Sequence, residues 1–301
     1  MKRHSLFAFV TPVFALSSIV ITLPSNAANF SSLSEVGLTI SDFSVFPTKV
    51  KTFADVDGVA IADQGEIDVL VEGDAIFVSD QETGIAFGDE FFATSIVGKG
   101  TDYLGEAYVI SKLLGTFYIP ADTPFSFGIA TDAYLANQTS NLTSAPLSTS
   151  ATIKLTLHDV WQGEKYNLID FYGRLGTTDI SPFNQDTLDL NTSPYLNVTG
   201  SQLGTQFGGK NESLFFGLNA DYQFTFDQDT KLLLTGTITS CSFASNTPGA
   251  CANVPEPSTK LGLIAGILFF FSIRMKKQIG EFSRQPFTKH FFQNFLLNIR
   301  G

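Results

Sequence analysis

The sequence predicts an all-β fold, most simply an antiparallel β-sandwich of jelly-roll type. Apolar residues alternate with polar ones in several short runs, which is the period of a half-buried strand. Glycine- and Asp-containing turns separate these runs at short intervals, and no long amphipathic helix can be traced between residues 30 and 250. The composition is 44% hydrophobic and 13% aromatic, so the chain can fill a core.

The clearest alternation falls in three places along the chain. Apolar residues occupy every second position in 125–129, 153–157 and 222–226. Residues 227–230, Asp-Gln-Asp-Thr, read as a hairpin loop from which 231–239 returns as the partner strand.

Two features bear on the core and on the number of domains. Most of the 30 phenylalanines lie between residues 28 and 253, where period-two spacing makes them core residues. Residues 137–152 are rich in Ser and Thr without apolar periodicity, which fits a surface loop or a boundary between two halves. The sequence leaves open whether the body is one β domain or two.

Charge divides the chain into three zones. Residues 1–28 contain two basic residues and no acid, residues 29–253 contain 27 acids against 9 bases, and residues 254–301 contain 7 bases against two acids. A body with a net charge of −18 argues against nucleic-acid binding, because attraction to phosphates needs clustered Lys and Arg.

The N-terminus has the pattern of a secretory signal peptide. Lys2 and Arg3 precede an apolar stretch, 6–21, and small residues precede a cleavage point after Ala27. We therefore expect a signal peptide over 1–27; a retained membrane helix is the alternative, but the short apolar stretch fits a signal better.

The C-terminus combines three features in a fixed order. Val254, Pro255, Glu256 and Pro257 are followed by the apolar run 261–273. A basic cluster comes next, formed by Arg274, Lys276 and Lys277. This order over 254–277 resembles the PEP-CTERM sorting signal, which implies processing by an exosortase-type membrane protease and one hydrophobic helix.

Elementary physical chemistry agrees with such a tag. Pro255 and Pro257 keep the segment extended and accessible. The 13 residues of 261–273 are fewer than the ~20 of a full span, so they suit a transient anchor, with the basic cluster staying cytoplasmic. An ordinary single-span anchor that is never cut is the alternative.

The chain continues beyond the tag. Residues 278–301 are basic and rich in Phe at near-helical spacing, which fits either an amphipathic helix on the inner membrane face or an extension removed with the tag. Tags of this family usually end soon after the basic cluster, so the extension makes processing an open question.

The two cysteines, Cys241 and Cys251, stand just before the tag. A turn-forming segment, 246–249, lies between them and could bring them together. In an oxidising compartment we expect a disulfide, whereas two thiols without a nearby histidine do not make a zinc site.

No catalytic residue emerges from the sequence. His158 is the one histidine of the body and sits on the polar face of an expected strand, where it reads as a surface residue. A serine nucleophile elbow, Gly-x-Ser-x-Gly, is absent from the chain. No cofactor is predicted.

Eleven carboxylates lie between Asp55 and Glu90. They read most simply as a solvated acidic face. Asp55, Asp57 and Asp63 form the best local calcium candidate, although the full loop pattern is missing. A glycosidase acid pair is the remaining alternative.

Trp161, the one tryptophan, precedes Tyr166, Phe171 and Tyr172. Such rings can form a carbohydrate site when they are exposed. A core tryptophan at a strand end is the simpler interpretation.

Together these features predict a non-enzymatic protein of the cell surface or extracellular matrix, exported across the inner membrane and anchored there at least transiently. The resemblance implies a bacterial exopolysaccharide or biofilm matrix and an exosortase as partners. A carbohydrate- or calcium-binding module and a polysaccharide-acting enzyme are the alternatives.

Overall fold

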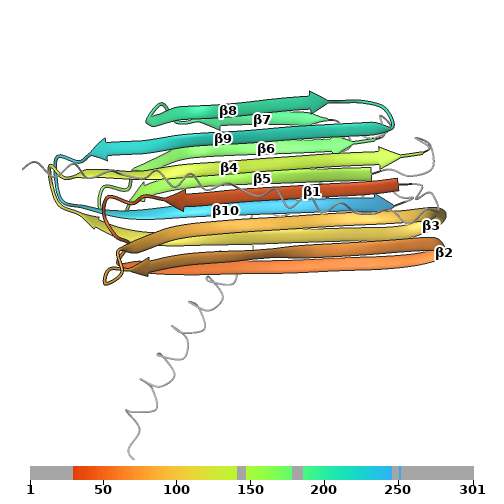
Figure 1. Cartoon of the computed structure of the whole chain (residues 1–301), viewed down its shortest axis with the longest axis horizontal. Helices are drawn as coiled ribbons and strands as arrows, with labels where there is room; N and C mark the ends of the chain where they lie inside the picture. The colour runs from red at the N-terminus through yellow and green to blue at the C-terminus, as the bar shows by residue number, and fades with distance from the viewer. Residues whose placement is uncertain (1–29, 141–146, 178–185, 246–250, 252–301) are drawn as a thin grey trace, which may run out of the picture.

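The structure, a computed structural model, describes residues 30–140, 147–177, 186–245 and 251. These residues form ten β-strands and no α-helix (Figure 1). The strands are β1 (Phe30–Ser41), β2 (Lys49–Asp80), β3 (Ile85–Ile119), β4 (Pro124–Thr139), β5 (Leu147–Asp159), β6 (Lys165–Gly176), β7 (Thr187–Thr192), β8 (Leu196–Gln206), β9 (Asn211–Thr225) and β10 (Thr230–Ser245).

All strand pairs are antiparallel, and they form one hydrogen-bonded path, β7-β6-β5-β10-β3-β1-β4-β9-β8, with β2 beside β3. The path folds into two facing layers because β3 changes partner along its length. Residues 88–98 of β3 pair with β1, whereas residues 104–119 pair with β10. The predicted all-β, sandwich-like fold is thus confirmed.

We name the two layers by their strands. Sheet I contains β8, β9, β4, β1, residues 85–98 of β3 and residues 66–80 of β2. Sheet II contains β7, β6, β5, β10, residues 104–119 of β3 and residues 49–62 of β2. The β2–β3 hairpin therefore belongs to both sheets and forms the outermost strand of each at the lower edge of Figure 1.

The corner between the sheets depends on glycine. The register of β2 against β3 shifts between Ala62 and Gly65, and Gly65 has φ +145°. A Cβ at Gly65 would lie 2.1 Å from the carbonyl oxygen of Lys99. Only glycine allows the two backbones to approach this closely at that φ, so the bend is encoded locally.

The core follows from strict alternation of inward and outward residues. In β4, for example, every second residue from Phe125 is buried. Phe171 of sheet II stacks on Phe216 of sheet I with ring centroids 4.5 Å apart. Aromatic rings dominate the largest fully buried side chains, which include Phe30, Phe92, Phe117, Phe125, Phe127, Phe171, Phe216 and Tyr222.

The alternating runs predicted from the sequence lie in β4, β5 and β9, and the predicted return strand 231–239 lies in β10. One predicted connection is wrong. Residues 227–230 do not form a hairpin loop, because β9 pairs with β4 and β8 while β10 pairs with β3 and β5. The turn instead carries the chain from sheet I to sheet II. Turn residues signal a reversal of direction and do not choose the partner strand.

The Ser/Thr-rich segment 137–152 is also more regular than expected. Its first residues end β4 and its last residues begin β5. The buried hydroxyl of Thr149 in β5 is tolerated because it donates to the backbone carbonyl oxygen of Cys241 on β10, at 3.1 Å.

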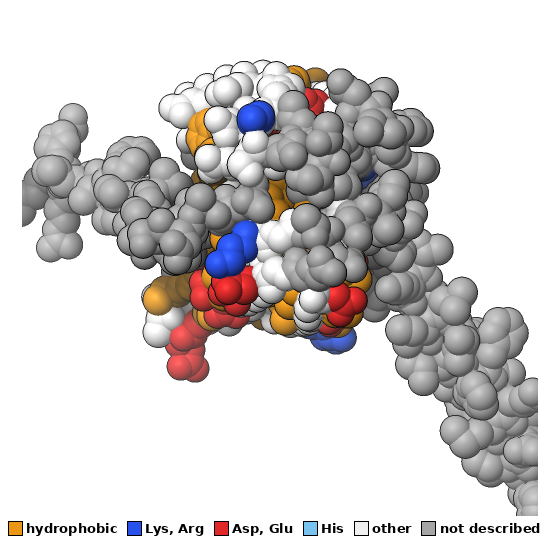
Figure 2. Space-filling view, turned by 90° about the vertical axis from the view of Figure 1, so that its right-hand side faces the viewer, with side chains coloured by type: hydrophobic (Ala, Val, Ile, Leu, Met, Phe, Trp, Pro, Cys, Tyr) orange, Lys and Arg blue, Asp and Glu red, His pale blue; other side chains and the backbone are white. Residues whose placement is uncertain are grey.

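Both described ends of the body lie at the same end of the sandwich. Phe30 pairs with Gly98, and Ser245 pairs with Leu104, on either side of the corner (Figure 1, right). We call this the terminal end, and we call the opposite end, with the turns 42–48, 120–123, 160–164 and 226–229, the far end. Figure 2 looks onto the terminal end and shows acidic side chains gathered toward the β2–β3 edge, where Glu66 and Lys99 form an ion pair of 3.1 Å.

Candidate functional site

Charged side chains are sorted between the two sheets. Sheet I as defined above has no basic residue in its strands, whereas sheet II has seven of the nine basic residues of the body. The other two, Lys99 and Lys210, lie at the corner and in the β8–β9 turn. The basic residues of sheet II are Lys49, Lys51, Lys112, Lys154, Lys165, Arg174 and Lys231.

Six lysines of sheet II converge on the half of its outer surface nearest the far end. Directly paired residues share a face of a sheet, so the register places them. Lys112 and Lys154 flank Thr237 in one row across the sheet. A second row lies two outward-facing positions closer to the far end. It contains the directly paired residues Lys49, Thr116, Leu233, His158 and Lys165.

We define this surface as the lysine face. His158 lies on it, half-buried, on the polar side of its strand as the sequence predicted. The members of the lysine face are Lys49, Lys51, Lys112, Lys154, His158, Lys165 and Lys231, with the rings of Tyr118 and Trp161 at its far-end margin.

The aromatic margin is exposed and ordered by contacts. Trp161 and Tyr118 are 57% and 47% exposed, and their ring centroids are 6.2 Å apart. The Lys231 ammonium lies 5.4 Å from the centre of the Tyr118 ring, within cation–π range. The core interpretation of Trp161 is therefore wrong.

Trp161 is exposed because its turn is held by the backbone and by a buried carboxylate. Asp159 Oδ1 accepts hydrogen bonds from the backbone N–H groups of Trp161 and Gln162, at 2.9 and 3.0 Å. These bonds close an Asx-type turn and point the indole away from the core. Of the other rings of this segment, Phe171 is buried and Tyr166 packs against the core.

Sheet I carries the opposite charge and a recess. A cavity of about 540 Å³ lies on its outer face, with Glu35, Asp89 and Asp132 among its lining carboxylates and Phe91 and Phe215 among its rings. Asp132 is paired with Gly37 on one neighbouring strand and with Gly217 on the other. Because these two glycines have no side chains, a recess is open on both sides of Asp132. We name this recess the carboxylate trough.

The carboxylates of the trough influence one another. Burial raises the pKa of Asp132, and the charge of Asp89 raises it further. Burial likewise raises the pKa of Glu35, with a smaller contribution from the charge of Asp132. Thr39 Oγ1 donates a hydrogen bond of 2.6 Å to Asp89 Oδ1. The trough is an anionic recess that disfavours anions and favours proton or cation uptake.

The calcium candidates do not form a common site. Asp55, Asp57 and Asp63 lie along β2 instead of in a loop, and Asp57 and Asp63 are separated by about 20 Å of extended strand at ~3.3 Å per residue. Among the described residues, no group of three or more His, Cys, Asp or Glu side chains could hold a metal. On an outermost strand these charges instead discourage edge-to-edge pairing.

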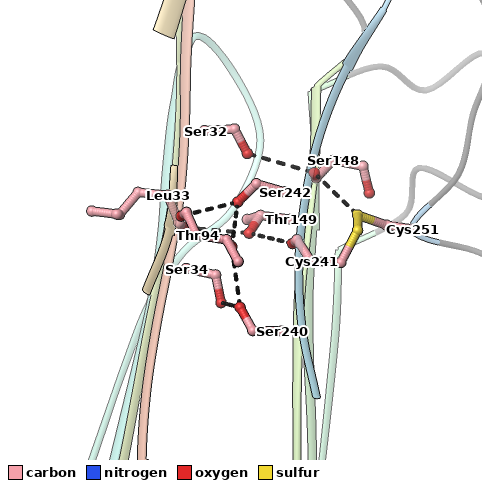
Figure 3. The surroundings of a disulfide bond; sticks show 10 residues. All are labelled: Ser32, Leu33, Ser34, Thr94, Ser148, Thr149, Ser240, Cys241, Ser242 and Cys251. Atoms are coloured by element: carbon pink, nitrogen blue, oxygen red, sulfur yellow. Dashed lines mark hydrogen bonds between the residues drawn. A yellow bond between two sulfur atoms is a disulfide. The ribbon is translucent and has the colours of Figure 1, made fainter. Parts of the chain in front are cut away.

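Cys241 and Cys251 form a disulfide with a Cα–Cα distance of 5.8 Å. It lies on the outer side of β10, where both cysteines pack with Phe243, Leu104 and Tyr108. Cys251 Sγ lies 3.6 Å from the carbonyl oxygen of Ser148 on β5 (Figure 3). The bridge thus fastens residue 251 to sheet II near the terminal end.

Beneath the disulfide, the core changes from rings to hydroxyl groups. Thr94 of sheet I is 3.1 Å from Ser240 and 2.9 Å from Ser242 of sheet II, and Ser240 donates to Ser34 at 2.8 Å (Figure 3). Each hydroxyl has a partner, which lowers the cost of burying it. This network joins the two sheets where small side chains replace Phe.

The expected signal peptide 1–27 with cleavage after Ala27, the motif and helix of 254–277 and the tail 278–301 lie outside the described residues. Within the described residues, no helix has the length and apolar character needed to cross a membrane. No family model, curated protein or solved structure matches the chain.

Proposed function

We propose that the chain is an exported, non-enzymatic protein of the cell surface or extracellular matrix, sorted by its PEP-CTERM-like tag and associated with exopolysaccharide. The observation that supports this proposal is the position of the disulfide. Cys251 is fastened to sheet II only three residues before Val254, so the last residue that the disulfide ties to the sandwich directly precedes the sorting motif. The two prolines of the motif favour the extended conformation that a processing enzyme needs.

The placement of the ends supports the same proposal. Phe30 follows the proposed cleavage at Ala27 by three residues, and it lies at the same end of the sandwich as Ser245. A C-terminal anchor would therefore hold the terminal end toward the membrane. The far end, with Trp161 and Tyr118, would face outward.

We also propose that the sandwich is of the jelly-roll type. Successive strands change sheets at the turns after β1, β3, β4, β7 and β9. Repeated crossing between two layers is how such double-sheet folds are built.

The test is the intact mass of the native protein from membrane and extracellular fractions. We expect a soluble species that begins near Ala28 and ends near Pro257. A Glu256→Ala variant should remain in the membrane fraction, and a Ser258→Ala variant should be released normally. A wild-type membrane species that still ends at Gly301 would contradict the proposal and make the chain a single-pass envelope protein.

A glycan-cleaving enzyme is the second candidate, and the carboxylate trough is the observation that favours it. Glu35 and Asp132 share one recessed surface, and burial raises the pKa of each, which is the environment of a general acid. Release of reducing ends from native exopolysaccharide, lost in both Glu35→Gln and Asp132→Asn, would establish it. No release from the wild type would exclude it for that substrate.

A further inference from the structure

We propose that the lysine face binds an acidic polysaccharide, a chain of sugars bearing carboxylate groups such as uronates. This inference rests on the proposed function for its setting, an exopolysaccharide matrix, and adds the ligand class and the surface. Charge complementarity, exposed aromatic rings and the surface of one sheet support it.

Most lysines of the lysine face have no carboxylate partner among the described residues. The structure has two ion pairs among the described residues, and on the lysine face only Lys154 has a carboxylate partner, Asp170 at 3.9 Å. Lys49 and Lys51 are exposed, and Lys112 stands half-buried in the next row. A body with a net charge of −18 thus keeps a group of unpaired ammonium groups on one face. Such a group attracts an anionic ligand.

Hydroxyl side chains lie between the lysines on the lysine face. Rows of outward residues are ~7 Å apart along a strand, and neighbouring strands are ~4.8 Å apart. Threonine hydroxyls occupy the positions between the cations: Thr116, Thr156, Thr235 and Thr237. Hydroxyl groups donate to and accept from sugar hydroxyls, while the ammonium groups pair with carboxylates.

Two exposed aromatic rings border the lysine face. Trp161 and Tyr118 are each about half exposed, although burial of such rings is normally favourable. The Asp159 carboxylate and the turn hold Trp161 outward, so its exposure is built into the fold. An apolar ring beside cations and hydroxyls suits the mixed polar and apolar faces of a sugar ring.

The favoured ligand is a polysaccharide rather than a nucleic acid or an anionic membrane. Among the described residues, the lysine face is bordered by the carboxylates of the β2 edge, which repel a broad phosphate surface more than one narrow chain. The lysine face is the outer surface of a sheet whose strands are paired side by side, so it suits one extended chain lying across it.

The experiment uses the full-length protein in mild detergent with polygalacturonate as the acidic probe and dextran as the neutral one. We expect retardation by polygalacturonate in affinity electrophoresis, little by dextran, and a loss of binding when salt rises from about 0.05 to about 0.5 M. The variant Lys49→Gln/Lys51→Gln/Lys112→Gln should bind about tenfold more weakly. Trp161→Ala should weaken binding as well.

The matched control is Lys99→Gln/Lys210→Gln, which removes lysines outside the lysine face and should bind as the wild type does. Equal loss in the control, or no binding by the wild type, would overturn the proposal. Equal affinity for DNA or for vesicles with anionic lipids would overturn the ligand class. If the wild type self-associates in analytical ultracentrifugation and the triple lysine variant does not, the lysine face binds a second copy of the chain and the polysaccharide proposal is overturned. The intact-mass experiment tests sorting independently of glycan binding. A failure of the sorting proposal can therefore be distinguished from a failure of the binding proposal.

Discussion

Glu90 provides the sharpest test of the fold's energetics. Its side chain points from sheet I into the core and is 1% exposed, and Ser111 Oγ of sheet II donates a 2.7 Å hydrogen bond to Oε1. Oε2 has no partner among the described residues and faces Gly236. Burial raises the pKa of Glu90 from 4.5 to about 7, opposed by the Ser111 bond and aided by the charge of Asp89.

The sign of the effect follows from proton linkage. Because the folded state holds the proton more tightly than the unfolded state, the contribution of Glu90 is fully present below pH 4.5 and is lost as pH rises through about 7. A shift of this size corresponds to about 3 kcal/mol in the free energy of unfolding. The variant Glu90→Gln is neutral at every pH and keeps the shape, so it should lack this loss.

Urea unfolding at about pH 4 and about pH 8 checks this prediction. Between these two pH values, the stability of Glu90→Gln relative to wild type should improve by about 3 kcal/mol. Glu82→Gln, in the exposed turn after β2, is the control and should follow the wild type. A pH dependence that is the same in Glu90→Gln and wild type would refute the reasoning.

Two further predictions concern covalent and backbone constraints. Replacing both Cys241 and Cys251 by Ala should lower the free energy of unfolding by about 2–3 kcal/mol, because a short loop is no longer closed in the unfolded chain; a reduced wild type that unfolds at the same urea concentration as the oxidised form would disagree. Gly73→Ala should cost about 2 kcal/mol or more, since Gly73 has φ +155° and a Cβ would lie 2.4 Å from the carbonyl oxygen of Phe91. Gly204→Ala, with nothing within 4 Å of the added Cβ, is its control and should leave the urea midpoint nearly unchanged.

Local pattern predicted the strands well because alternation is a property of each strand alone. The runs 125–129, 153–157 and 222–225 lie in strands with the expected inward residues. The same reasoning failed at the hairpin predicted over 227–230, where the chain crosses between the two sheets. It also failed at Trp161, where the buried Asp159 holds the indole outward. In both cases the contact that decides the structure lies outside the short run of residues on which the prediction rested.

The candidate surfaces show the same division. Lys49 and Lys165 are distant in the sequence, and no spacing rule relates them; pairing through β3, β10 and β5 places them in one row. Glu35 and Asp132 come together in the same way through the β1–β4 register. Single residues such as these carry no signal in a body that contains 27 acids.

The sequence by itself determined the strand content, the acidic body and the spacing that lets Cys241 and Cys251 meet. These properties depend on neighbours along the chain: period-two alternation, composition and short loops. The tertiary structure decided which sheet each strand joins, and hence the lysine face, the trough and the buried Glu90. Strand pairing is a long-range choice made by the whole core, so residues far apart in sequence become one surface only when the sandwich closes.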